Sequence, residues 1–206
     1  MITVIKGKNS GEFAEKYAAE KPGNKYYIAT MRVKTDEDKA IVERHRARRE
    51  GMGFMTIEQD VAIVKAIDKI KWTESLLGGL TGLETLIAEK INEYTGKEAN
   101  KGTEKKIERV ALIEDIPTLC ANEMFIANHE FVPHKDVENT ILFGIAFLKE
   151  FFTDIVIVTE DNPDIADYNN EVIGEEPVAE FNAAMTEINA AVSRFAEEEY
   201  NQPAKP

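Results

Sequence analysis

The sequence has a single cysteine, Cys120, and no long uninterrupted apolar run. One cysteine excludes an intramolecular disulfide framework and is typical of a protein from a reducing compartment. No apolar run reaches the roughly 18 residues that a membrane span requires, and the first residues lack the pattern of a signal peptide. We therefore expect a soluble, cytoplasmic protein that has no membrane partner.

Positive charge is also scarce, because 25 Lys and Arg residues stand against 38 Asp and Glu residues, a formal net charge of −13. This balance argues against binding to nucleic acid or to an anionic membrane through bulk electrostatics. A local cluster of arginines can still hold a nucleotide. With 206 residues, 43% of them apolar, the chain can bury one good core. We expect one domain, residues 1–206.

Short β-rich runs alternate with helical stretches along the chain, which is typical of βαβ units. Continuous apolar runs at 109–114 and 154–159 predict central strands that are buried on both sides. The fold class is therefore α/β, with a mainly parallel sheet covered by helices on both faces. The other expected strands are 2–6, 25–29 and 54–57, and the expected helices are 12–20, 35–49, 60–71 and 137–152.

A glycine loop, Gly7-Lys8-Asn9-Ser10-Gly11, joins the first expected strand to the first expected helix. In a phosphate-binding loop, backbone N–H groups cradle the phosphate, a lysine reaches the β- and γ-oxygens, and a hydroxyl binds magnesium. Here Glu12 and Phe13 stand where the lysine and the hydroxyl belong. Lys6 or Lys8 could reach a phosphate from the other side of the loop. A tight turn without a ligand is the alternative interpretation of the two glycines.

Four blocks carry a recognisable order and spacing. The first, residues 2–58, holds the glycine loop, Phe13-Ala14-Glu15, Tyr27-Ile28-Ala29-Thr30, an arginine-rich helix around His45, and Thr56-Ile57-Glu58. The others are 110–125, 154–160 and the Ile188-Asn189 pair of the last helix. Together they resemble the bifunctional adenosylcobinamide kinase/adenosylcobinamide-phosphate guanylyltransferase family of cobalamin biosynthesis.

The resemblance implies a P-loop NTPase-like fold and a transferase that uses GTP or ATP with Mg²⁺. It implies phosphoryl and guanylyl transfer to a corrinoid, and a homo-oligomer whose expected form is a trimer. In this family the histidine that His45 matches accepts GMP from GTP as a phosphoramidate. Because the loop lacks its lysine, we expect an impaired kinase step. A non-catalytic relative that acts as a binding or regulatory protein is the alternative.

Candidate catalytic residues are His45 and Glu114, and no metal ligands are assigned. A solvated surface histidine and a strand-end acid that makes caps or salt bridges are the alternative interpretations. Thr30 and Arg32 follow the second strand, at the sheet edge where open α/β folds bind ligands, and arginines near one turn of His45 can stabilise developing charge. The candidate nucleotide-binding residues are Gly7, Lys8, Asn9, Ser10, Gly11, Thr30, Arg32, Arg46 and Arg49.

Two regions depart from the family pattern. Residues 72–106 match nothing in it, and we expect a helical insertion that serves as a lid or a subunit contact. Its apolar residues are Leu76, Leu77, Leu80, Leu83 and Ile87. Family members usually close with a strand after the last helix, but here the end is polar and broken by proline. We therefore expect an acidic helix end and a disordered tail at 200–206. We also expect strand 109–114 to lie beside the first strand.

Overall fold

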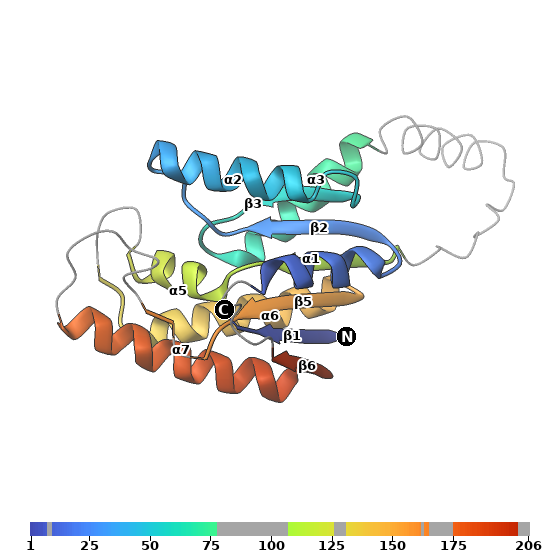
Figure 1. The fold of residues 1–206 in the computed structure, drawn as a ribbon. Helices are drawn as coiled ribbons and strands as arrows, with labels where there is room; N and C mark the ends of the chain where they lie inside the picture. Colours follow the sequence, from blue (N-terminus) through green and yellow to red (C-terminus); the bar gives the residue numbers. More distant parts are fainter. Residues whose placement is uncertain (8–9, 78–106, 126–130, 162, 165–174, 202–206) are drawn as a thin grey trace, which may run out of the picture.

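The computed structural model describes residues 1–7, 10–77, 107–125, 131–161, 163–164 and 175–201 (Figure 1). Strands and helices alternate, as the periodicity predicts. The elements in chain order are β1 (Ile2–Lys6), α1 (Gly11–Glu20), β2 (Asn24–Ala29), α2 (Asp36–Arg48), β3 (Phe54–Glu58), the 3₁₀ turn η1 (Ile63–Lys65), α3 (Ala66–Leu77), β4 (Arg109–Ile113), α5 (Ile116–Met124), α6 (His134–Phe151), β5 (Asp154–Thr159), α7 (Glu175–Phe195) and β6 (Glu198–Asn201).

The strands form one six-stranded sheet in the order β3-β2-β4-β5-β1-β6. Every pairing in it is parallel, which confirms the α/β fold class. The expected place of strand 109–114 beside β1 is wrong, because β4 pairs with β2 and β5, and β5 separates it from β1. Both β4 and β5 are continuous apolar runs in the sequence. Such a run predicts that a strand is buried, but it does not predict which strand pairs with β1.

The sheet separates two unequal apolar layers. The larger layer packs α3, α5, α6 and α7 against one face, with residues such as Ile113, Leu119 and Phe181 at its centre. On the other face α1 contributes Ala14 and Ala18 to a smaller layer. Helix α2 lies on the same side as α1, above β2 in Figure 1, but none of its 13 residues is buried.

The expected helix 60–71 begins later and ends later than the sequence indicates. The chain turns at Ala62, whose φ of 48° is left-handed, before η1 and α3 begin. The first residues of the expected insertion, 72–77, form the end of α3. The remainder of the expected insertion, 78–106, lies outside the described residues, as do Lys8, Asn9, His129 and the tail 202–206.

The expectation of a frayed end after the last helix is wrong, because β6 pairs in parallel with β1 from Thr3↔Glu198 to Lys6↔Asn201. Both acidic side chains of this short edge strand have a partner. Glu199 pairs with Lys6 at 3.1 Å, and Glu198 accepts a hydrogen bond from Tyr17. Tyr200 packs its ring 5.5 Å from that of Tyr17, so tertiary contacts outweigh the weak local preference for a strand.

Candidate functional site

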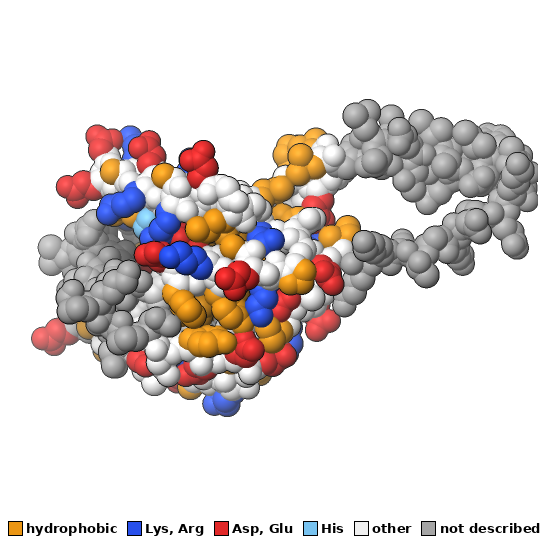
Figure 2. Space-filling view, turned by 45° about the vertical axis from the view of Figure 1, so that its right-hand side comes forward, with side chains coloured by type: hydrophobic (Ala, Val, Ile, Leu, Met, Phe, Trp, Pro, Cys, Tyr) orange, Lys and Arg blue, Asp and Glu red, His pale blue; other side chains and the backbone are white. Residues whose placement is uncertain are grey.

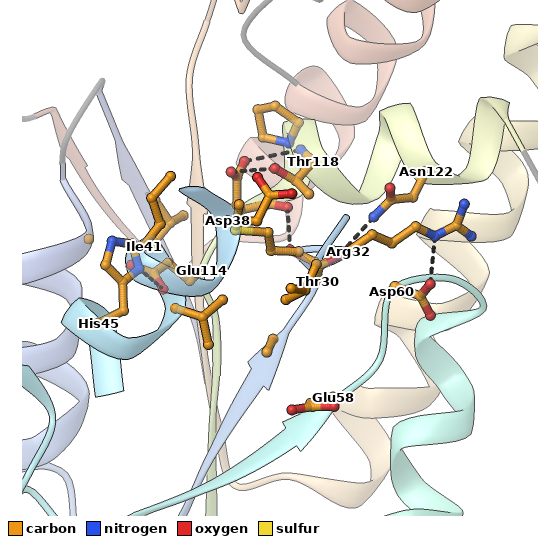
Figure 3. Close-up of a pocket in the computed structure, with 18 of the residues that line it drawn as sticks. Thr30, Arg32, Asp38, Ile41, His45, Glu58, Asp60, Glu114, Thr118 and Asn122 are labelled. Atoms are coloured by element: carbon orange, nitrogen blue, oxygen red, sulfur yellow. Dashed lines mark hydrogen bonds and ion pairs between the residues drawn. The ribbon is translucent and has the colours of Figure 1, made fainter. Parts of the chain in front are cut away.

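A cleft of about 1120 Å³ opens at the carboxyl ends of the parallel strands. It is bounded by the glycine loop, the inner side of α2 and the first turns of α5 (Figure 3). Open α/β sheets bind their ligands at this edge, because the loops that follow the strands converge there. All the candidate site residues that the structure describes line this cleft: Gly7, Ser10, Gly11, Thr30, Arg32, His45, Arg46, Arg49 and Glu114.

The glycine loop has the geometry of a strand–loop–helix turn. Gly7 has a φ of 127°, which only glycine adopts without strain, and Ser10 is the N-cap residue of α1. A Cβ atom on Gly11 would lie 2.5 Å from Oε1 of Glu114. Any side chain at the first residue of α1 would therefore displace the Glu114 carboxylate, which lies against Gly11.

Helix α2 presents His45 to this carboxylate. The helix begins with a reciprocal cap, in which the Thr35 side chain accepts from the Asp38 N–H and the Asp38 carboxylate accepts from the Thr35 N–H. At its other end, His45, Arg48 and Arg49 are spaced i, i+3 and i+4. Residues at this spacing share one face of a helix, and here that face meets Glu15 and Glu114.

A cluster of ion pairs joins α1, α2 and the end of β4. The carboxylate of Glu15, which is fully buried, accepts from Arg48 Nε and Nη2 at 2.5 and 2.9 Å and from Arg49 Nη1 at 3.1 Å. Arg48 Nη2 also donates to Glu114 Oε1 at 3.1 Å. The guanidinium of Arg49 stacks 3.4 Å above the ring of Tyr27. Two acidic side chains and two guanidiniums thus form one connected network beside the glycine loop.

His45 and Glu114 are adjacent, with Nδ1 of the imidazole 3.5 Å from Oε2 of the carboxylate. Burial lowers the pKa of His45 below its usual value, and the nearby guanidinium of Arg48 lowers it further. Burial, together with the negative charges of Glu15 and Asp115, raises the pKa of Glu114 to about 8. Arg48 and Arg49 already pair with Glu15, so they offset only part of the effect of burial on the pKa of Glu114. His45 is therefore a neutral imidazole near pH 7, which is the nucleophilic form.

The far side of the cleft is held by a second set of polar contacts (Figure 3). Thr30 donates its hydroxyl to the Asp115 carbonyl at 3.2 Å, and Asn122 donates to the Thr30 carbonyl at 2.7 Å. Arg32 donates through Nε to Asp60 at 2.6 Å and through Nη1 to the Phe125 carbonyl at 3.1 Å. Thr30 and Arg32 face the cleft opposite His45, and these contacts fix their orientation.

Sequence reasoning missed part of the cluster. It named Arg46 and Arg49 as the arginines near one turn of His45, but Arg46 donates at 2.9 Å to Glu58, an exposed carboxylate on β3. The guanidinium nearest Glu114 is that of Arg48, which follows from the i+3 spacing. Glu15 stands in the Phe13-Ala14-Glu15 motif, but nothing in the sequence gave it a role at the site. Lys6, a candidate for replacing the lost lysine, pairs with Asp161 at 3.3 Å and with Glu199, and it does not line the cleft.

Comparison with known proteins bears on these features. The model of a family described as cobinamide kinase/cobinamide phosphate guanyltransferase matches residues 2–108. This span is just over half of the chain and runs from β1 to the residue before β4. The chain belongs to this family. It is therefore a member of a P-loop NTPase-like, nucleotide-binding transferase family of cobalamin biosynthesis, whose substrates are a nucleotide and a corrinoid.

The residues of this chain that match the cobinamide kinase/guanyltransferase family model include the glycine loop and all of α2. Glu114 lies beyond the matched residues. No curated protein matches the chain. In the parts of the chain that the structure describes, no helix is both long and apolar enough to cross a membrane.

Proposed function

We propose that this chain is a nucleotide-dependent transferase acting on a corrinoid, that guanylyl transfer through His45 is its retained activity, and that its kinase step is impaired. One observation carries the proposal. His45 Nδ1 lies 3.5 Å from Glu114, beside the guanidiniums of Arg48 and Arg49 and next to the glycine loop. A nucleophile, an orienting carboxylate and positive charge are the parts that nucleotidyl transfer needs.

The chemistry follows from the two ring nitrogens of His45. Because Nδ1 faces Glu114, the opposite nitrogen, Nε2, is left to attack the α-phosphorus of GTP. An N–P bond forms, the bond to the β-phosphate oxygen breaks, and pyrophosphate leaves. The phosphate of the corrinoid then attacks the same phosphorus, so the N–P bond breaks and His45 is regenerated. The guanidiniums stabilise the charge that develops on the phosphoryl oxygens.

The impaired kinase step is supported by the charges around the loop. Glu12, in the first turn of α1, pairs with Lys16 at 2.8 Å, and it places a carboxylate where an anion should bind. The carboxylate of Glu114 lies against Gly11. Lys6 is engaged with other acids. A triphosphate would therefore meet the carboxylate of Glu12 near the position where the family pattern supplies a lysine.

Mg²⁺ binding by the protein itself is not favoured by these side chains. Mg²⁺ prefers several oxygen ligands, yet Glu114 is occupied by guanidiniums, and Asp115 caps α5 through the N–H and hydroxyl of Thr118. Among the described residues there is no group of three His, Cys, Asp or Glu side chains that could hold a metal ion. We infer that any magnesium enters with the nucleotide.

Labelling with radioactive GTP tests the proposal. The protein should take up label from GTP labelled on the α-phosphate and not on the γ-phosphate, and the label should be lost in acid and kept in alkali. His45→Asn should abolish it. His134→Asn is the matched control, because His134 pairs with Glu180 on α7, away from the cleft. GTP binding in calorimetry without any label on the protein would overturn the proposal and favour the non-catalytic alternative.

A further inference from the structure

Helix α2 carries the proposed nucleophile without a fully buried apolar side chain. None of its residues is buried, and none belongs to either apolar layer of the described fold. Among the described residues, the polar contacts that join α2 to the other elements are those of its last turn with Glu15, Glu114 and Glu58. The pair with Glu58 is exposed, and such a pair contributes little to stability. The position of His45 therefore depends on buried charge pairs.

Glu15 is the fixed point of these pairs. It lies on α1 between Ala14 and Ala18, whose side chains are buried against the sheet, so its carboxylate cannot follow a moving α2. Its two oxygens accept three N–H groups, two from Arg48 and one from Arg49. Glu15 does not line the cleft, so it has no direct route to a bound nucleotide.

We propose that Glu15 is a positioning residue for guanylyl transfer, which clamps the two arginines at the end of α2 and thereby fixes the distance between His45 and the glycine loop. This inference rests on the proposed function. It deepens that function, because it proposes that a carboxylate without contact to the substrate fixes the position of the nucleophile. The chemistry of the clamp is a two-point carboxylate–guanidinium contact, which constrains both distance and orientation.

Two substitutions separate the effect of the charge of Glu15 from the effect of its side-chain length. Glu15→Gln keeps the shape of the side chain but turns N–H donors toward guanidiniums that need acceptors. Glu15→Asp keeps the charge but withdraws the carboxylate by one methylene group, so it cannot contact both arginines. We expect each variant to label with GTP about 10²-fold more slowly, which is the cost of misplacing a reacting group by about 1 Å.

The direction in which the pKa of His45 moves distinguishes positioning from simple electrostatics. The sequence has three histidines, so His45→Asn identifies the imidazole signal of His45 in an NMR titration. Burial, Arg48, Arg49 and Arg44 lower the pKa of His45, while the negative charge of Glu15 raises it. If Glu15 only supplied charge, its removal would lower this pKa further. If it holds α2 in place, Glu15→Gln exposes the imidazole, and the pKa rises toward 6.5.

A matched pair at the opposite end of β4 provides the control. Glu74 accepts from Arg109 Nε and Nη2, both at 2.8 Å, and it has no contact with the cleft. Glu74→Gln should lower the stability of the protein while leaving the labelling rate and the pKa of His45 unchanged. Arg48→Lys, which keeps the charge but loses the two-point contact, replaces Glu15→Gln if that variant does not fold.

Faster amide hydrogen exchange of residues 36–48 in Glu15→Gln, with exchange of α1 unchanged, is the expected structural result. The inference is overturned if exchange of α2 and the pKa of His45 stay as in the parent protein, or if the pKa falls. If the parent protein does not label, the proposed function fails, but exchange and titration still decide whether Glu15 positions α2.

Discussion

At the scale of single residues, Glu15 and Glu114 share the guanidiniums of Arg48 and Arg49 beside the glycine loop. The two carboxylates differ in their surroundings. Glu15 accepts three hydrogen bonds, whereas Glu114 accepts one from Arg48 and faces the cleft. A buried carboxylate with few donors binds its proton tightly, and this property of Glu114 makes the stability of the protein depend on pH.

Glu114→Gln should flatten that pH dependence. The pKa of Glu114 is about 8 in the folded protein against an ordinary value of 4.5, so the folded state binds the proton more tightly than the unfolded chain. Its stabilising contribution is full below pH 4.5 and is lost as the pH rises through 8. At about 1.36 kcal/mol per pKa unit, the loss is on the order of 5 kcal/mol. Because Glu114→Gln is neutral at every pH, it does not lose this contribution. Its free energy of unfolding, relative to that of the parent protein, should therefore rise as the pH rises.

Urea unfolding at several pH values between 5 and 8.5 measures this difference. Glu58→Gln is the control, because Glu58 is exposed and its replacement should leave the pH profile unchanged. Parallel profiles for the parent protein and Glu114→Gln would contradict the prediction.

The altered loop leads to a second prediction at this scale. A charge-assisted phosphate contact contributes a few kcal/mol, and about 1.4 kcal/mol corresponds to a tenfold change in rate. Adenosylcobinamide kinase activity should therefore be at least ~10³-fold below that of a relative with an intact loop. Insertion of Lys-Ser after Gly11 should restore part of the affinity for a triphosphate in calorimetry, whereas insertion of Ala-Ser should not. Rapid phosphorylation by the unaltered protein would refute this.

His45 and Glu114 could be found from the sequence because short motifs surround them. Glu15 could not, although it stands in the Phe13-Ala14-Glu15 motif. Its role depends on the approach of α1 to α2, and a pairing across 33 residues leaves no periodic pattern. Arg46 and Arg49 were chosen as the arginines near one turn of His45, but the fold determines which of the four neighbouring arginines meets an acid.

At the scale of elements, β6 shows how a polar segment becomes a strand. The ring of Tyr200, a residue of β6, lies 5.7 Å from the ring of Phe13 and 5.5 Å from the ring of Tyr17. Strands β1 to β5 were all expected, because apolar β-rich runs mark them. β6 has one aromatic residue among acids and an amide, so its pairing with β1 could not be inferred from hydrophobicity.

Tyr200→Ala should destabilise the protein by about 1–2 kcal/mol, because it removes a partly buried aromatic ring from this cluster. Phe195→Ala is the matched control. Phe195 is 51% exposed at the end of α7, and its loss should cost less than about 0.5 kcal/mol. Urea unfolding measures both. An equal decrease in the free energy of unfolding for the two variants would mean that β6 does not stabilise the edge of the sheet.

At the scale of the whole molecule, the outer side of α3 is apolar. Trp72, Leu76 and Leu77 are 68%, 59% and 72% exposed. Figure 2 shows hydrophobic side chains gathered where the described chain stops before residue 78. Large exposed apolar side chains in one place are a common sign of a protein–protein contact. We propose a homo-oligomer, with a trimer as the expected form.

Light scattering should give about three times the monomer mass of 23.2 kDa. Leu77→Glu should shift the protein toward the monomer, because it buries a charge in the contact. Phe143→Glu on α6, at a position 59% exposed, is the control and should leave the mass unchanged. A mass of one chain across a concentration series would exclude the oligomer.

The pairing of β1 also has a consequence for the order in which the protein can fold. β1 is synthesised first, but its two neighbours are β5 and β6, which begin at residues 154 and 198. Half of the sheet therefore cannot close on a nascent chain until nearly all of it has left the ribosome. Contacts so distant in sequence slow folding, and until they form, the apolar residues Ile2, Val4 and Ile5 remain open to pairing with other chains. A premature stop before residue 198 would leave β1 as a bare edge and make aggregation the expected fate of the product.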